Sequence, residues 1–146
     1  MSVEHDAVWY EKLNSRLSGS AGLEYRLVPP EPLKDSDAAA EPNDPGSYLS
    51  SNKEYRGHSF RSYASQIDEF PEEHFDIVLI DGRARPSCIR HATSRLKPGG
   101  MLVVDNSDRP NYRRALAEVK GYSRMSFRGA VPQLIGWSQT DIFVKS

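Results

Sequence analysis

The sequence has a single cysteine, Cys88, and it lacks both long apolar runs and blocks of one charge. One thiol cannot form a disulfide within the chain or a cysteine-rich zinc site, so nothing indicates an oxidising compartment. No stretch approaches the roughly 18 apolar residues of a membrane span. Residues 1–7 have neither the basic nor the apolar part of a secretory signal. These absences predict a cytoplasmic protein that has no membrane as a partner.

The charge balance excludes a second class of partner. The chain carries 19 basic and 20 acidic side chains, a formal net charge of -1, and a pI near 6.4. Such a balance gives no electrostatic reason to expect nucleic acid as a partner. At 146 residues the chain is long enough to bury one hydrophobic core, so we expect a single domain over residues 1–146.

Two apolar runs, each followed by an acid, dominate the middle of the chain. Residues 77–80 precede Asp81, and residues 101–104 precede Asp105 and Asn106. Unbroken Ile, Val and Leu runs are typical of strands buried on both faces of a parallel sheet. Ligands bind such sheets at the carboxyl ends of the strands. The sequence therefore predicts that these three polar side chains lie close together at one edge of the sheet.

The rest of the chain alternates between helical and extended patterns. The predicted helices are 9–17, 60–67, 86–96 and 112–119, and the other predicted strands are 2–5, 23–28, 124–127 and 137–144. Asp6 is the expected N-cap of the first helix, and its apolar stripe of Trp9, Leu13 and Leu17 is expected to face the core. The two last strands are expected to form an antiparallel hairpin. Helices that alternate with strands indicate an α/β fold.

Residues 29–57 form an exception, because they show no helical or strand period. Five of the ten prolines lie between Pro29 and Pro45. A stretch of this length inside a compact domain is usually a functional lid or a disordered segment. We predict a flexible flap with some apolar anchorage from Tyr48, Leu49 and Tyr55, and Tyr48 is a candidate for contact with a substrate.

Three motifs resemble the class I S-adenosylmethionine-dependent methyltransferases. They are F-D-I-V-L-I-D-G at 75–82, L-K-P-G-G-M-L-V-V-D-N at 96–106 and T-D-I-F-V at 140–144, which are similar to the family's fourth, fifth and last strands. The resemblance implies a Rossmann-like sandwich whose mostly parallel sheet ends in an antiparallel strand. It also implies S-adenosylmethionine as cofactor, with Asp81 and Gly82 beside its methionine end.

The N-terminus S-V-E-H-D resembles the end of the family's second strand. In that position Glu4 would bind the ribose hydroxyls of the cofactor, with His5 beside it. A carboxylate at the carboxyl end of a strand can accept two hydrogen bonds from a cis-diol, so the chemistry of Glu4 agrees with the role that the resemblance implies.

The family's first strand and its Gly-rich E-x-G-x-G loop have no counterpart in this sequence. In the family's strand order, 3-2-1-4-5-7-6, the missing strand is the central one. The resemblance therefore implies an N-terminally truncated domain with unpaired backbone groups in mid-sheet. The second and fourth strands could pair directly, pair with another chain, for instance in a homo-oligomer, or leave a marginal half-domain.

The trio of Asp81, Asp105 and Asn106 resembles the magnesium site of catechol-type O-methyltransferases. Hard oxygen ligands suit Mg²⁺, and the metal would hold and deprotonate a substrate hydroxyl. In the alternative interpretation, Asp81 contacts the cofactor or the start of the next helix, while Asp105 and Asn106 stabilise a turn.

Arg83, Arg85 and Arg109 are candidates for binding an anionic group of a substrate, or for ion pairs with Asp81 or Asp108. The function that follows is methyl transfer to a small molecule, with oxygen as the expected acceptor atom. The alternative is an inactive or partner-dependent remnant of such an enzyme. A nicotinamide-binding domain is disfavoured because the sequence has no G-x-G-x-x-G.

Overall fold

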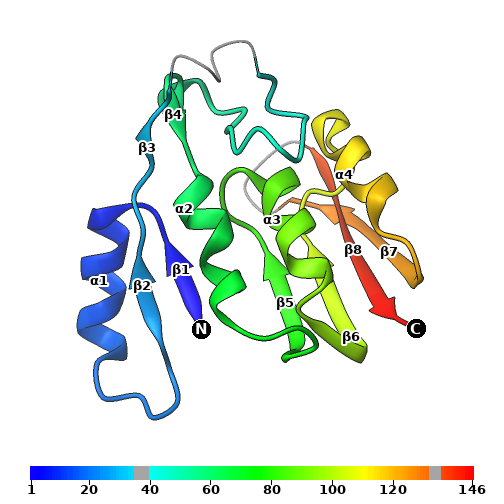
Figure 1. Ribbon diagram of the computed structural model, residues 1–146, viewed down its shortest axis with the longest axis horizontal. Helices are drawn as coiled ribbons and strands as arrows, with labels where there is room; N and C mark the ends of the chain where they lie inside the picture. Colours follow the sequence, from blue (N-terminus) through cyan, green and yellow to red (C-terminus); the bar gives the residue numbers. More distant parts are fainter. Residues whose placement is uncertain (35–39, 132–135) are drawn as a thin grey trace.

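The largest element of the fold is a four-stranded sheet (Figure 1). The computed structural model describes residues 1–34, 40–131 and 136–146. The sheet has the strand order β5 (Phe75–Ile80), β6 (Leu96–Val104), β8 (Trp137–Lys145) and β7 (Tyr122–Ala130). β5 and β6 are parallel, whereas β8 is antiparallel to both of its neighbours. The predicted parallel pair and the C-terminal hairpin are therefore confirmed.

Four short strands form two further sheets. β1 (Ser2–Glu4) pairs in parallel with β2 (Tyr25–Leu27), and β3 (Glu31–Pro32) pairs antiparallel with β4 (His58–Ser59). β1 and β5 belong to different sheets. Of the arrangements expected for an incomplete sheet, direct pairing of these two strands is thus not the one that the described residues adopt.

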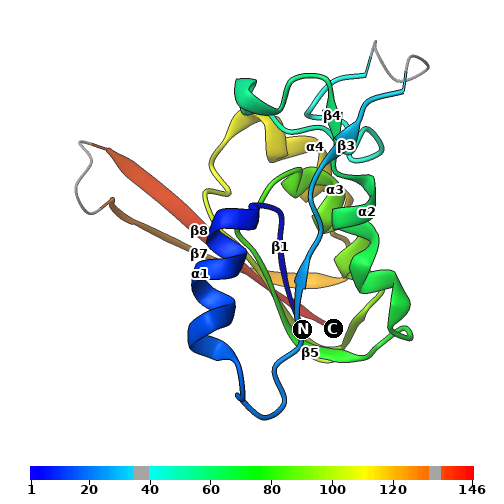
Figure 2. The same cartoon turned by 90° about the vertical axis from the view of Figure 1, so that its left-hand side faces the viewer.

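The helices lie on both sides of the strands (Figure 2). α1 (Ala7–Leu17) packs on β1 and β2, while α2 (Arg61–Ala64), α3 (Arg85–Thr93) and α4 (Arg113–Glu118) lie on the opposite side. The described residues also form the short 3-10 helices η2 (Lys53–Tyr55), η3 (Ser65–Glu69) and η4 (Pro110–Tyr112). Among the described residues, no helix combines the length and the apolar composition that crossing a bilayer requires.

The core lies between the sheet and helices α3 and α4. Its strand residues are Ile80, Leu102, Val104 and Phe143, and its helix residues are Ile89, Ala92 and Ala115, with Leu96 at the start of β6. The register places Ile80 beside Val104. Both strands therefore end at the same level of the sheet, which puts the residues after them at one edge.

The prediction that β5 is buried on both faces is wrong. The side chains of Ile77 and Leu79 are 56% and 64% exposed, and Met125 and Phe127 of β7 are also exposed. The strand register places these residues on one face, which the described helices α2 to α4 leave uncovered. Trp9 is exposed as well, and α1 has no buried residue. The prediction that the apolar stripe of α1 faces the core is therefore wrong.

The segment 29–57 is anchored where the structure describes it. Pro45 and Tyr48 are buried, and the backbone amide of Phe60 donates to the carbonyl of Tyr48 at 2.8 Å. Residues 35–39, in the middle of the predicted flap, lie outside the described residues. The predicted apolar anchorage is confirmed for Tyr48, and the flexibility of the flap stays a prediction.

Candidate functional site

The structure brings Asp81, Asp105 and Asn106 together at the carboxyl ends of β5 and β6. The backbone amide of Asp105 donates to the carbonyl of Ile80 at 3.1 Å, which ties the two strand ends to each other. Thr140 of β8 donates from its hydroxyl to Asp105 Oδ1 at 3.0 Å. The parallel register of β5 and β6 therefore explains why the three side chains meet, although they are far apart in the sequence.

A guanidinium group lies among these three residues. Arg85 Nη2 donates to the Asp81 carbonyl and to Asp81 Oδ1, both at 2.8 Å. Its Nη1 donates to the Asp105 carbonyl and to Asn106 Oδ1, the latter at 3.2 Å, and Nε donates to the Gly82 carbonyl at 3.0 Å. These five acceptors match the five N–H donors of a guanidinium. The side chain of Arg85 is only 7% exposed.

The turn after β5 is what aims Arg85 back at the strand ends. Ala84 lies in the left-handed region, with φ 45° and ψ 41°, immediately before α3 begins at Arg85. This conformation is unfavourable for a residue with a Cβ. Pro86 follows in the first turn of the helix, where a missing N–H costs nothing. The D-G-R-A-R-P sequence thus holds Ala84 in a strained backbone conformation, and this conformation places the buried Arg85 at the strand ends.

The two carboxyl groups at the site differ in acidity. Burial raises the pKa of Asp81, Arg85 opposes this, and the negative charge of Asp105 adds to the rise. Burial also acts to raise the pKa of Asp105, but the hydroxyl of Thr140 and the backbone amide of Asn106 outweigh it and lower that pKa. Asp105 is therefore the firmly ionised member, and Asp81 is the stronger base.

The residues present do not fit the magnesium site that the sequence resemblance implies. The three oxygen-bearing side chains surround the Arg85 guanidinium, and Asn106 Oδ1 accepts from Arg109 Nη2 at 2.8 Å as well as from Arg85. Within the part of the chain that the structure describes, no group of three or more His, Cys, Asp or Glu side chains is arranged to hold a metal. The ion pair between Asp81 and Arg85, which the sequence left open as the alternative to substrate binding by Arg85, is observed.

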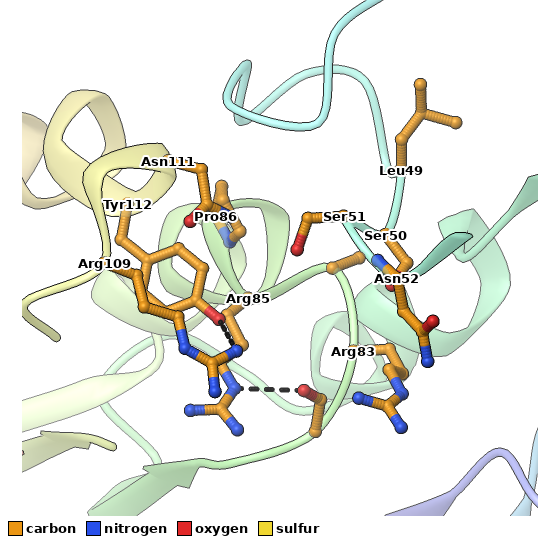
Figure 3. A pocket seen from close by; sticks show the side chains of 12 residues that line it. Leu49, Ser50, Ser51, Asn52, Arg83, Arg85, Pro86, Arg109, Asn111 and Tyr112 are labelled. Atoms are coloured by element: carbon orange, nitrogen blue, oxygen red, sulfur yellow. Dashed lines mark hydrogen bonds between the residues drawn. The ribbon is translucent and has the colours of Figure 1, made fainter. Parts of the chain in front are cut away.

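A pocket of about 310 Å³ adjoins Arg85, and we call it the arginine pocket (Figure 3). It is lined by Leu49, Ser50, Ser51, Asn52, Gly82, Arg83, Ala84, Arg85, Pro86, Arg109, Asn111 and Tyr112. Figure 3 shows the guanidinium groups of Arg83, Arg85 and Arg109 gathered at one end of it. Arg109 contacts Asn106 and the Tyr112 hydroxyl. Among the described residues, neither Arg83 nor Arg109 forms an ion pair with a carboxylate.

Tyr48 lines neither this pocket nor the groove described below, and its contact with a substrate stays a prediction. Its amide donates to Ser87 Oγ at 3.1 Å, its hydroxyl lies 3.2 Å from His91 Nε2, and the Arg61 guanidinium lies 4.1 Å from its ring centre. Tyr48 therefore anchors its segment, and the residues directly after it line the arginine pocket instead.

A second hollow of about 870 Å³ lies between the free edges of β1 and β5, and we call it the β1–β5 groove. Glu4 and His5 line it at the end of β1, and Asp81, Gly82 and Arg83 line it at the end of β5. Gly82 and Arg83 line the arginine pocket as well. The groove and the pocket therefore adjoin each other at the D-G-R turn.

Glu4 is held by its neighbours through one carboxylate oxygen. Its Oε1 accepts from the amides of His5 and Asp6 at 2.7 and 2.9 Å, and His5 Nδ1 lies at 2.9 Å. Its Oε2 accepts no hydrogen bond from the described residues. Burial lowers the pKa of His5, and its Nε2 lies 3.0 Å from the Tyr55 hydroxyl. A neutral His5 with its proton on Nδ1 satisfies both contacts.

The sequence analysis missed several residues of the site. Tyr63, Thr140 and Tyr112 all contact it or line it, yet each lies in an apolar or strand pattern that predicts packing. Gly82, by contrast, was already predicted as a site residue from the sequence. A Cβ at Gly82 would lie 2.1 Å from the Tyr63 hydroxyl oxygen, so this close approach requires glycine.

Comparison with known proteins finds similarity in structure only. No protein-family model and no curated protein matches the chain. It superposes on the O-methyltransferase from Bacillus cereus in complex with SAH with a TM-score of 0.60 and 12% identity, which covers 99% of this chain and 61% of that one. A putative O-methyltransferase from Klebsiella pneumoniae gives 0.60 and 16%, with coverage of 99% and 60%.

A third similar structure is the O-methyltransferase TomG from Streptomyces achromogenes, which is involved in tomaymycin synthesis and was solved in complex with SAM. Its TM-score is 0.56 at 17% identity, and 99% of this chain covers 60% of that one. The chain thus has the fold of the class I SAM-dependent methyltransferases. It spans about 60% of the length of the structures that it matches.

Proposed function

We propose that the protein is a SAM-dependent methyltransferase that acts on an oxygen atom of a small molecule. The observation that carries the proposal is the junction of the β1–β5 groove with the arginine pocket at Gly82 and Arg83. Methyl transfer requires a donor site and an acceptor site that meet at one point. The similar structures from Bacillus cereus and Streptomyces achromogenes, which are complexes with SAH and SAM, support this assignment.

The groove is the proposed donor site. Glu4 Oε2 would accept a hydrogen bond from a ribose hydroxyl, while Oε1 stays bound to the amides of His5 and Asp6. The neutral ring of His5 lies beside it. The turn at Gly82, which lines the groove, would adjoin the methionine end of the cofactor. These roles agree with the size of the groove, about 870 Å³, which is ample for a nucleoside-sized ligand.

The arginine pocket is the proposed acceptor site, and its charge indicates an anionic small molecule. Arg85 is neutralised by Asp81 and Asp105, whereas Arg83 and Arg109 are not paired with a carboxylate among the described residues. A guanidinium binds a carboxylate or a phosphate through two parallel hydrogen bonds. We therefore assign the role of binding the acceptor's anionic group to Arg83 and Arg109.

The catalytic residues in this proposal are Asp81, Asp105 and Asn106. S-adenosylmethionine would supply the methyl group: the acceptor oxygen would bond to the methyl carbon as the bond from that carbon to sulfur breaks, and the hydroxyl proton would pass to a carboxylate. Asp81 is the better base of the two acids because its pKa is raised. Asp105 and Asn106 orient the acceptor. A cytoplasmic location and the absence of nucleic-acid partners stay predictions that belong to this proposal.

The experiment that tests the proposal is titration calorimetry with SAH, the product form of the cofactor. We expect binding of one SAH per chain, because both strand ends that line the groove are in place. Absence of binding heat at millimolar SAH, by a chain that circular dichroism shows to be folded, would contradict the proposal. The alternative of an inactive remnant would then be preferred.

A further inference from the structure

Arg85 lies among Asp81, Asp105 and Asn106, the three side chains that the sequence resemblance implies as ligands of a divalent cation. We infer that its guanidinium is a built-in replacement for that metal. The inference concerns the oxygen-rich end of the arginine pocket, and only its catalytic consequence rests on the proposed function. It assigns to Arg85 the task of holding Asp81, Asp105 and Asn106 in one arrangement.

The guanidinium of Arg85 is fully hydrogen-bonded. It donates to the carbonyl oxygens of Asp81, Gly82 and Asp105 and to the side-chain oxygens of Asp81 and Asn106. The carboxylate oxygen Oδ2 of Asp105 lies 3.5 Å from Nη1. Each side chain that would bind a metal thus already faces a cation.

The positive charges of Arg85 and Arg109 also oppose the binding of a divalent ion. A divalent ion among the same oxygens would lie within a few ångströms of the Arg85 charge, and Arg109 adds a second guanidinium at Asn106 Oδ1, 2.8 Å away. Like charges at such distances repel strongly at the effective dielectric constant of a protein surface. A metal could bind only if Arg85 left.

The side chain of Arg85 is also held in place by its surroundings. Its side chain is 7% exposed, and the left-handed conformation of Ala84 fixes the direction in which it departs from the backbone. Moving the guanidinium away would leave the part-buried carbonyl oxygens of Asp81, Gly82 and Asp105 without this donor, which is unfavourable. The fixed cation is therefore part of the fold and not a side chain that a metal displaces.

The consequence for the proposed reaction is that this chain positions its acceptor without a divalent ion. Arg85 is a positioning residue, because it acts through Asp105 and Asn106. A fixed charge also makes the site insensitive to the supply of metal and to chelators.

The test measures binding of Mn²⁺, as the probe for a divalent site, by electron paramagnetic resonance of the free ion. We expect no specific binding to the native chain. Arg85→Ala removes the guanidinium but keeps the three oxygen-bearing side chains, so it should bind one Mn²⁺ at least tenfold more tightly than the native chain. Arg83→Ala removes one positive charge from the same turn without opening the oxygen cluster, and it should stay like the native chain.

A second substitution checks where the ion binds. Asp105→Asn in the Arg85→Ala background should abolish the acquired Mn²⁺ binding. The inference is overturned if the native chain binds one Mn²⁺ that Asp105→Asn removes, or if a folded Arg85→Ala chain gains no binding. Should Arg85→Ala fail to fold, Mn²⁺ broadening of amide resonances at residues 81–85 and 105–106 of the native chain decides: none is expected, and selective broadening there contradicts the inference.

Discussion

Arg83 and Arg109 are the two residues on which the chemical class of the acceptor depends. Arg83 has a buried Nε that finds no partner among the described residues, and its guanidinium lies 5.5 Å from the Tyr55 ring centre. In the described part of the chain, the hydrogen bonds of the Arg109 side chain go to two neutral groups, Asn106 and Tyr112. Positive charges that form no ion pair attract anions into a pocket, so the pocket is expected to prefer acidic acceptors.

A pair of probe molecules tests this preference. We expect 3,4-dihydroxybenzoate to bind the chain in the presence of SAH about tenfold more tightly than catechol, because a hydrogen-bonded charge adds about 1.5–3 kcal/mol. Arg109→Gln should reduce that preference to about twofold. Arg128→Gln, which removes an exposed charge on β7, is the matched control and should leave the ratio unchanged. Equal affinity of the native chain for both probes would contradict the proposal.

Residue types alone could not reveal the role of Arg85. The sequence shows two arginines, Arg83 and Arg85, just after Asp81 and leaves both ion pairing and substrate binding open. The left-handed Ala84 decides between them, since it turns Arg85 inward while Arg83 stays at the pocket. That conformation depends on tertiary packing around a non-glycine residue, and no local pattern predicts it.

At the scale of single elements, the apolar runs were sufficient to predict β5, β6 and the hairpin. Burial was not predictable in the same way, because it depends on which helices cover which face. α2 is another example: the predicted helix over 60–67 begins as an α-helix at Arg61–Ala64 and continues as the 3-10 helix Ser65–Glu69. The apolar period correctly predicted a helix, but it does not distinguish an α-helix from a 3-10 helix.

Asp141 of β8 links the two strands of the C-terminal hairpin, a role that was not predicted from the sequence. It lies fully buried on β8 and accepts from Arg124 Nη2 and Ser126 Oγ of β7, both at 2.6 Å, and from Gln139 Nε2 at 2.9 Å. Burial acts to raise the pKa of Asp141, but these hydrogen bonds outweigh it and lower that pKa. The carboxylate therefore fastens the two strands of the hairpin to each other.

We expect Asp141→Asn to lower the free energy of unfolding by about 2 kcal/mol at pH 7, since an amide cannot satisfy three donors. Because the folded pKa lies below the ordinary 3.8, the contribution is complete above pH 3.8 and is lost as the pH falls through the folded value. Urea unfolding at pH 7 and pH 3 measures this: the difference between the two proteins should shrink at pH 3. Asp76→Asn, in an exposed pair with Lys97, should change stability little; an equal loss there would contradict the assignment.

At the scale of the whole molecule, the uncovered face of the sheet is the main feature. Ile77 and Leu79 lie on it and also line the β1–β5 groove, and exposed apolar faces of this kind mark association surfaces. The sequence predicted a homo-oligomer, and we keep that as a proposal: a second copy of the chain covers this face.

Light scattering coupled to size exclusion tests self-association. We expect the measured mass to rise above 16.4 kDa as the concentration increases, and Leu79→Lys to shift the association at least tenfold toward higher concentration. Leu79 is already 64% exposed, so the change should not unfold the monomer. Glu72→Lys, an exposed substitution before β5, is the control. A constant monomer mass at all concentrations would contradict the proposal.

The central claim is that the ends of β1 and β5 together hold the cofactor, and the effect of Glu4→Gln on SAH affinity tests it most directly. Glutamine keeps one oxygen for the amides of His5 and Asp6 but loses the second acceptor. Calorimetry should show binding weakened about tenfold or more, and Glu11→Gln on the exposed side of α1 should leave it unchanged. Equal SAH affinity in the native chain and in Glu4→Gln would contradict the claim.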